Sequence, residues 1–391
     1  MNLIQEKLDV QQKKRSNIFN WRGQFTPEFV EYILDCANLQ PNALVADPFA
    51  GSGTVLIESA IKGYSSVGFE INPAAYQMAS FYRYSILNLA QRHELLFEIE
   101  KELAPLVSKL NGQAIYVDAK DYRTAYKGLI NVSKEIQNID NHEFLPFLMN
   151  VLFLSEKDKK LTVKESLLSS YNSLKKSLLN LPFCDSEINV FNSDARTIST
   201  HYQGNIDLIL TSPPYINVFN YHQNYRAVTE AFKYDILGVA HSEFGSNRKN
   251  RGNRLLTVVQ YCLDMEASIN NFWHSLKDGG RLVMVVGRES NVRKTPFYNG
   301  EIVSTLISDM GGYEMKGREE RSFSNKFGQR IFEDILIFEK QGDTSPNPKK
   351  AVEIAENHLK EAEKVAPTDV LCDFKDVYLK LNNVKPSPVF K

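Results

Sequence analysis

The sequence has few cysteines, no long apolar run and no excess of charge of either sign. Its four cysteines are widely separated and have no histidine at a metal-ligand interval; they are Cys36, Cys184, Cys262 and Cys372. No metal site is therefore predicted, and the thiols are expected to be reduced. The first residues lack the apolar stretch of a secretory signal, and no uncharged apolar run is long enough to cross a bilayer. We expect a cytoplasmic protein with no membrane partner.

The charge balance limits how the chain can bind a polyanion. With 46 basic and 47 acidic residues, the formal charge is −1, so any affinity for nucleic acid must come from local clusters of basic residues. A hydrophobic content of 43% in 391 residues is enough for one large α/β domain and an accessory domain.

Strand and helix patterns alternate in two separate parts of the chain, 1–74 and 182–340. Strands are predicted at 43–46, 65–69, 188–191, 206–210, 281–286 and 334–338, and helices at about 26–38 and 54–62. We expect an α/β fold: a doubly wound, Rossmann-like sheet of seven strands. Residues 75–181, rich in Leu, Lys and Glu with helical spacing, predict a helical insertion. Residues 341–391 predict a linker and a helical tail, peripheral to the core.

The turn behind the first strand has the features of a ligand-binding loop. Asp47-Pro-Phe-Ala-Gly-Ser-Gly-Thr54 joins a strand to a helix, and Gly51 and Gly53 allow left-handed torsions and close approach of backbone to a ligand. It is not a phosphate loop, because no Gly-Lys-Ser/Thr follows and Leu56 stands where a third glycine would be.

Two acids follow the next two strands. A carboxylate at the end of the second strand, Glu70, can accept hydrogen bonds from both hydroxyls of a ribose. Asp194, after the third strand, can accept from the amino group of an adenine. Together they predict a ligand that contains adenosine. The alternative is that both acids are helix N-caps or solvated turn residues.

A second loop, Thr211-Ser-Pro-Pro-Tyr215, directly follows the strand at 206–210. Because ligands collect at the carboxyl ends of parallel strands, we expect this loop and residues 47–54 to face one crevice. The Ser212 hydroxyl and the Pro213 carbonyl can accept N–H bonds from a planar amine, and the two prolines fix the torsions that present them. Tyr215 offers a face for stacking a base. The alternative is a rigid turn without function.

The segments 47–54 and 211–215 together resemble the amino-directed DNA methyltransferases, which transfer a methyl group from S-adenosylmethionine to the exocyclic amine of cytosine or adenine. The resemblance implies S-adenosylmethionine as cofactor, double-stranded DNA as substrate, and flipping of the target base. It favours cytosine-N4 over adenine-N6, because members with Asp in place of Ser212 usually act on adenine. No Pro-Cys is present for a covalent ring-carbon mechanism.

The resemblance also assigns roles to residues. The expected catalytic residues are Ser212, Pro213, Pro214 and Tyr215. The expected cofactor-binding residues are Phe25, Thr26, Asp47, Phe49, Gly51, Gly53, Thr54, Glu70, Asp194 and Thr211, and 24–27 matches the segment that packs over the methionine part of the donor. In this chain the donor loop comes first and the insertion lies between the second and third strands, so the insertion at 75–181 is only a candidate target-recognition region.

Candidate DNA contacts lie beyond the catalytic loop. They are Phe219, Tyr221, His222, Arg226, Arg248, Lys249, Arg251 and Arg254. For the aromatic residues the alternative is core packing, and for the basic ones it is a solvated surface. A more dilute basic group, Arg318, Arg321, Lys326 and Arg330, is predicted to lie in a long loop before the last strand, with solvated surface favoured.

Other functions stay open at the level of sequence. A methyltransferase of RNA or protein nitrogen would use a similar catalytic loop, and a binding module without activity would keep the donor pocket. A cognate restriction endonuclease is compatible as a functional partner of a site-specific enzyme.

Overall fold

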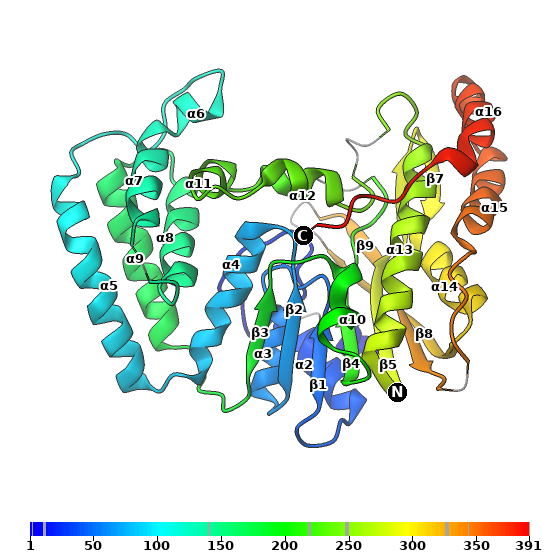
Figure 1. Cartoon of the computed structure of the whole chain (residues 1–391), viewed down its shortest axis with the longest axis horizontal. Coiled ribbons are helices and arrows are strands. Elements are labelled where there is room, and N and C mark those ends of the chain that lie inside the picture. Colours follow the sequence, from blue (N-terminus) through cyan, green and yellow to red (C-terminus); the bar gives the residue numbers. More distant parts are fainter. Residues whose placement is uncertain are drawn as a thin grey trace.

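A computed structural model describes residues 1, 3–10, 13–139, 141–217, 220–246, 250–324, 328–342 and 344–390. The core is a seven-stranded sheet in the order β3-β2-β1-β4-β5-β9-β8 (Figure 1). Its strands are β1 (Leu44–Asp47), β2 (Ser65–Phe69), β3 (Ile188–Phe191), β4 (Ile206–Thr211), β5 (Leu276–Gly287), β8 (Tyr313–Ser324) and β9 (Arg330–Lys340). A separate hairpin consists of β6 (Glu289–Val292) and β7 (Thr295–Tyr298).

The strand directions place the site. β1 is parallel to both β2 and β4, and β4 is parallel to β5, whereas β9 is antiparallel to β5 and to β8. From β1 the chain builds the sheet first in one direction, through β2 and β3, and then in the other, through β4 and β5. The crevice at such a reversal is where ligands bind in open α/β sheets. The predicted doubly wound α/β fold is confirmed.

Helices precede, connect and follow the strands. They are α1 (Gln5–Leu8), α2 (Pro27–Ala37), α3 (Thr54–Ile61), α4 (Pro73–Phe81), α5 (Leu89–Lys109), α6 (Tyr122–Ala125), α7 (Lys127–Gln137), α8 (Leu145–Lys157), α9 (Val163–Leu179), α10 (Ile198–His201), α11 (Arg226–Ala231), α12 (Ile236–Ser242), α13 (Leu256–Ser275), α14 (Asn299–Met310), α15 (Ala351–Glu363) and α16 (Leu371–Lys380). Short 3-10 helices are η1 (Tyr82–Ile86), η2 (Ala195–Thr197), η3 (Tyr221–Gln223), η4 (Thr368–Val370) and η5 (Leu381–Asn383).

Alternate strand residues build two cores, one on each face of the sheet. Leu208 and Leu210 pack in a cluster with residues of α2 and α3. Ile209, between them, faces the other way and packs in a cluster with residues of α13, α14 and α15. This alternation is what a strand covered on both faces requires.

The insertion forms a lobe at the β3 end of the sheet (Figure 1). Helices α5, α7, α8 and α9 share a buried cluster with α3 and α4, so the lobe's core is continuous with that of the donor-loop helix. The predicted boundary at residue 75 falls inside α4, which packs against β3 and α8 and belongs to the crossover from β2.

Two predictions about the C-terminal half are wrong. The region 313–324, expected to be part of a long loop, is the edge strand β8; its charged residues hid the strand pattern because an edge strand exposes much of its length. The tail is not peripheral, since Ile354 of α15 and Phe374 of α16 are fully buried in the main core.

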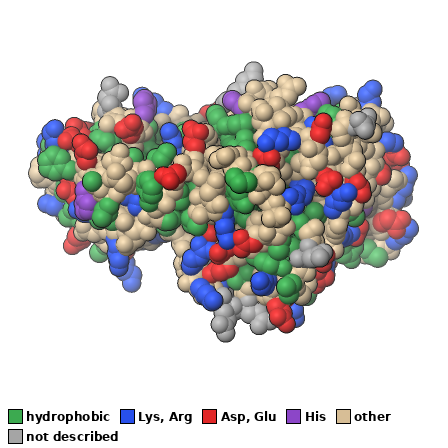
Figure 2. Space-filling view, turned by 90° about the horizontal axis from the view of Figure 1, so that it is seen from below, with side chains coloured by type: hydrophobic (Ala, Val, Ile, Leu, Met, Phe, Trp, Pro, Cys, Tyr) green, Lys and Arg blue, Asp and Glu red, His purple; other side chains and the backbone are tan. Residues whose placement is uncertain are grey.

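The face seen from below in Figure 1 carries interspersed acidic and basic side chains (Figure 2), in keeping with the formal charge of −1. Among the described residues, no helix is both long and apolar enough to cross a membrane.

Candidate active site

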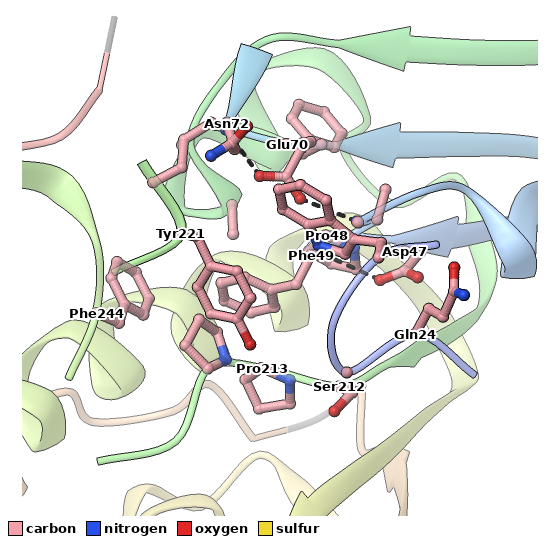
Figure 3. A pocket seen from close by; sticks show the side chains of 18 of the residues that line it. Gln24, Asp47, Pro48, Phe49, Glu70, Asn72, Ser212, Pro213, Tyr221 and Phe244 are labelled. Carbon is pink, nitrogen blue, oxygen red and sulfur yellow. Dashed lines mark hydrogen bonds between the residues drawn. The ribbon is translucent and has the colours of Figure 1, made fainter. Parts of the chain in front are cut away.

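The glycine turn and the proline loop open onto one cavity. It contains about 1110 Å³ of empty space, counting the part open to solvent. In Figure 3, Glu70 and Asn72 lie at one end, Ser212 and Pro213 at the other, and Tyr221 between them. The predicted residues that line the cavity are Phe25, Asp47, Phe49, Gly51, Thr54, Glu70, Asp194, Ser212, Pro213, Pro214, Tyr215 and Tyr221.

Asp47 ties the two loops together. It ends β1, and its Oδ1 accepts hydrogen bonds from the Thr211 hydroxyl at 2.5 Å and from the Phe49 N–H at 3.1 Å. Thr211 ends β4, so this contact closes the crevice between the two strand ends. Burial raises the pKa of the Asp47 carboxyl to about 7, although the bonds from Thr211 and Phe49 act in the opposite direction.

Glu70 is held by backbone amides on both oxygens. Oε2 accepts from Gly51 N–H at 2.9 Å and Oε1 from Asn72 N–H at 2.8 Å. These bonds fix the carboxylate and leave acceptor capacity for the cavity, because a carboxylate has about four lone-pair sites. Burial raises the pKa of Glu70 to about 7, against the bonds from Asn72 and Gly51.

Asp194 is more constrained than predicted. It caps η2, and its carboxylate is paired with Arg196 at 2.6 Å. Its Oδ2 also accepts from the N–H of Phe390 at 3.1 Å. Arg196 in turn bonds Asp264 and the carbonyls of Ser387 and Pro388, so this network holds the C-terminal segment beside the cavity. Asp194 therefore lines the cavity and also caps a helix, so the two alternatives weighed for it do not exclude each other.

The two glycines of the donor loop are required for different structural reasons. Gly51 has φ +52°, and a Cβ there would lie 3.2 Å from Trp21 Cδ1 in the cavity wall. Gly53 has φ +89°, and its Cβ would lie 2.9 Å from Ala79 Cα of α4. Gly53 therefore permits close packing of α3 against α4 and does not line the cavity.

The catalytic loop is fixed by a strand that is distant in sequence. The Tyr215 hydroxyl lies 3.2 Å from Ser212 Oγ and donates to Glu333 Oε1 on β9, also at 3.2 Å. A Cβ at Gly287 of β5 would lie 2.5 Å from Tyr215 Cε2, so the tyrosine ring rests on that glycine. Burial, then the Glu333 carboxylate, raises the pKa of Tyr215 well above its usual value.

Aromatic rings form the cavity walls. Tyr221 stacks on Trp21 with ring centroids 5.8 Å apart, and Phe49 meets Phe244 edge to face at 5.6 Å. Burial, with the nearby carboxylates of Glu70 and Glu243, raises the pKa of Tyr221 to about 12. A planar ligand that enters between these walls would replace its contacts with water by contacts with aromatic rings, so its transfer from water would cost little free energy.

Several predicted residues lie elsewhere. Thr26, Gly53 and Thr211 do not line the cavity, although each borders a residue that does. The assignment of His222 as a DNA contact is contradicted: the side chain is 2% exposed and its Nδ1 lies 2.7 Å from Glu243 Oε2. His222 is buried because η3, the short helix that contains it, packs against α12.

The predicted basic contacts are not gathered at the cavity. Arg226 pairs with Glu230 of its own helix, whereas Arg251 and Arg254 are exposed in the segment before α13. Arg321, expected on a solvated surface, is buried beside Glu333. Phe219, Arg248, Lys249 and Lys326 lie outside the described residues.

Sequence reasoning missed several lining residues. They are Trp21, Arg22, Gly23, Ile71, Asn72, Ser193, Ala195, Glu243 and Phe244. Trp21 to Gly23 directly precede the predicted 24–27 segment, so extending that segment would have found them. Glu243 and Phe244 carry no local signal, because only the fold brings them to the cavity.

The fold and cavity define an α/β protein with a site at the switch point of its sheet. The family model described as "DNA methylase" matches residues 4–81, which include the donor loop and Glu70. The type II methyltransferase M.BsoBI of Geobacillus stearothermophilus is 22% identical over 78% of this chain and 70% of its own length. M.MjaII of Methanocaldococcus jannaschii, another type II methyltransferase, is 38% identical over 14% of this chain and 10% of its own.

A solved S-adenosylmethionine-dependent methyltransferase from Methanosarcina mazei covers 79% of this chain and 98% of its own, with a TM-score of 0.36 and 12% identity. The family and sequence matches confirm the predicted resemblance to the amino-directed DNA methyltransferases. They imply S-adenosylmethionine as cofactor and support methyl transfer to DNA as the class of activity.

The residues present fit that cofactor. Four carboxylates line the cavity, those of Asp47, Glu70, Asp194 and Glu243, of which Asp194 is already paired with Arg196 outside the wall, and among the described lining residues Arg22 is the one basic side chain. This balance suits a ligand that is cationic at its centre and carries one carboxylate, and it disfavours a nucleoside polyphosphate. Glu70 directly follows β2, and a carboxylate at the end of the second strand is the group that accepts ribose hydroxyls in nucleotide-binding folds.

Proposed function

We propose that this protein is a site-specific DNA methyltransferase that acts on the exocyclic amine of a flipped base, preferably cytosine-N4. The observation that carries the proposal is the shared cavity of the donor loop and the Ser-Pro-Pro-Tyr loop, closed by the Asp47 to Thr211 hydrogen bond. The bound cofactor supplies an electrophilic methyl group. The protein supplies orientation and hydrogen-bond acceptors.

At the donor end of the site, the methyl donor would be bound by hydrogen-bond acceptors that are already held in place. The Glu70 carboxylate, held by two backbone amides, accepts the ribose hydroxyls, and Asp194 lies where an adenine amine would approach. Because both carboxylates are already positioned, little side-chain freedom is lost when the donor binds. Thr26, Gly53 and Thr211 would act indirectly at this end, because each is next to a lining residue but does not itself line the cavity.

The acceptor end must make a poor nucleophile reactive. The lone pair of an exocyclic amine is delocalised into the ring, so acceptors at Ser212 Oγ and the Pro213 carbonyl are needed to hold both N–H groups and leave the lone pair free. Pro213 and Pro214 have no N–H that could compete. We expect the flipped base to stack on an aromatic wall built from Tyr215 and Tyr221.

Cytosine is preferred because the acceptor is a hydroxyl. A carboxylate in this place binds an amine more strongly and is usual in relatives that act on adenine. Adenine-N6 remains the second candidate, because Ser212 can accept from either amine.

DNA is expected to lie over the carboxyl ends of the strands. Arg226 and the exposed Arg251 and Arg254 would contact phosphates. The insertion lobe, which begins after α4 and contains α5 to α9, would read the target. A cognate restriction endonuclease would fit such an enzyme as a functional partner.

The test uses labelled donor with unmethylated DNA, RNA and protein in parallel. We expect label only in DNA, and base-resolved sequencing to report N4-methylcytosine within one motif. Ser212→Ala is expected to lower kcat at least 100-fold while the Kd for the donor stays within about twofold. Ser345→Ala, in the exposed linker, is the control. Label in RNA or protein alone, or donor binding without transfer by wild type, would contradict the proposal.

A further inference from the structure

The carboxylate of Glu333 is not explained by donor or base binding. It stands on β9, opposite Gly287 of β5, and does not line the cavity. Its Oε1 accepts from the Tyr215 hydroxyl at 3.2 Å, and its Oε2 lies 3.1 Å from Arg321 Nε. Arg321 is itself 6% exposed, so this ion pair lies inside the protein.

A chain of hydrogen bonds leads from this pair to the cavity. Tyr215 bonds Glu333 on one side, and on the other its oxygen lies 3.2 Å from Ser212 Oγ. Each hydroxyl has one proton to donate, so the group at the end of the chain decides which way every proton points. An ionised carboxylate has no proton and can only accept.

We propose, on the basis of the proposed function, that Glu333 is a positioning residue that makes Ser212 a hydrogen-bond acceptor toward the target amine. Because Glu333 accepts the hydrogen bond from the Tyr215 hydroxyl, the Tyr215 oxygen is left to accept a hydrogen bond from the Ser212 hydroxyl. Ser212 then turns its lone pairs to the cavity. A serine thereby performs the accepting role that an aspartate has by its own charge.

Two features keep the hydrogen bonds directed from Ser212 through Tyr215 to Glu333. Burial and the Glu333 carboxylate raise the pKa of Tyr215, so the phenol stays protonated and able to donate. Arg321 pairs with Glu333 and is braced in turn, with its guanidinium 4.0 Å from the centroid of the Phe29 ring. Hydrogen bonds in such a chain also strengthen one another.

The test replaces the carboxylate by its amide. In Glu333→Gln, the new NH2 group can donate to the Tyr215 oxygen, which frees the Tyr215 proton to point at Ser212 and turns the serine proton toward the amine. We expect kcat for DNA to fall about 10- to 100-fold, as is typical for a partner behind the reacting group, with the donor Kd within about twofold of wild type. Glu333→Asp, which keeps an acceptor-only group, should recover part of the activity.

A double-mutant cycle separates polarity from structure. If Glu333 acts through the Tyr215 hydroxyl, adding Glu333→Gln to Tyr215→Phe should change kcat less than about twofold further, whereas independent effects would multiply. Full activity of Glu333→Gln, equal loss in the aspartate and glutamine variants, or multiplying effects would overturn the inference and leave the methyltransferase proposal standing. A wild-type protein that methylates no base would overturn both.

Discussion

At the scale of single residues, the site depends on carboxylates that are buried before any ligand binds. Asp47 and Glu70 are surrounded by protein, and burial raises the pKa of each to about 7. Each has hydrogen bonds that favour its ionised form, but these do not offset the loss of water. A cationic ligand would supply the missing compensation, so the site is suited to bind positive charge.

This arrangement predicts how stability and donor binding change with pH. The folded-state pKa of each group lies above its ordinary value, so the contribution to the stability of the ligand-free protein is fully present below about pH 4 and is lost as pH rises toward 7. Donor binding should follow the opposite course, because it needs the ionised carboxylate. With a pKa of about 7 for Glu70, the fraction ionised rises about tenfold between pH 6 and pH 8, so the Kd should fall by up to that factor.

Titration calorimetry with S-adenosylmethionine at pH 6, 7 and 8 would measure this. Glu70→Gln, which cannot titrate, should bind more weakly and with a smaller pH dependence. A Kd that is independent of pH in the wild type would show that the carboxylates are already ionised or do not meet the ligand.

At the scale of elements, the C-terminal segment supports one residue of the site without lining the cavity. It follows α16 and lies across α13, where Ser387 N–H donates to Asp264 at 2.7 Å. Beyond α13, Phe390 N–H donates to Asp194, which caps η2, at 3.1 Å. Figure 1 shows the segment passing over the carboxyl edge of the sheet to end near β2 and β3. Asp194 is therefore held from outside its own loop.

Removing one N–H tests this contact. Phe390→Pro deletes the donor to Asp194, and loss of a hydrogen bond of about 1 kcal/mol should raise the Kd for the donor about fivefold without a comparable change in the KM for DNA. Phe390→Ala keeps the N–H and is the matched control. Equal effects of the two variants would assign the role to the ring instead, and tighter donor binding in the proline variant would show that the segment competes with the donor.

The sequence predicted the elements whose pattern is local. β1, β2, β3 and β4 lie within a residue of their predicted positions, and the two loops follow them because a strand end and a glycine or proline turn are encoded side by side. β8 was missed because its alternation is charged along an exposed edge. Glu243 and Glu333 were missed because long-range pairing alone brings them to the site, as when register sets Glu333 opposite Gly287.

At the scale of the whole molecule, the insertion and the core are joined through the segment after the catalytic loop. α11 packs against α7 and α8, and the Tyr225 ring lies 4.9 Å from that of Phe153 in α8. A shift of the lobe would therefore displace α11 and, through it, the preceding η3 with Tyr221. If the proposed function holds, this connection would link a lobe that reads the target to the pocket that takes the base.

The exposed arginines before α13 provide a test of where DNA lies. If Arg251 and Arg254 each contact a phosphate, the double alanine variant should weaken DNA binding for every sequence alike, and the slope of log affinity against log salt should become less steep by about 1.8. Lys277→Ala is a control, since that side chain is 48% exposed at the start of β5, away from the strand ends that form the site. Fluorescence anisotropy at several salt concentrations measures both values, and an unchanged slope would place the DNA elsewhere.

The position of β9 has a consequence for the time course of synthesis. β9 is made last of the seven strands but lies between β5 and β8, so β8 has no neighbour in the sheet until β9 arrives. Residue 333 follows residue 215 by 118 positions, which at ~5–20 residues per second is about 6–24 s on the ribosome. During that interval a nascent chain holds its glycine turn and its proline loop but lacks both the Glu333 carboxylate and the strand that separates β5 from β8, so the sheet and the support of the Tyr215 hydroxyl are completed only late in synthesis.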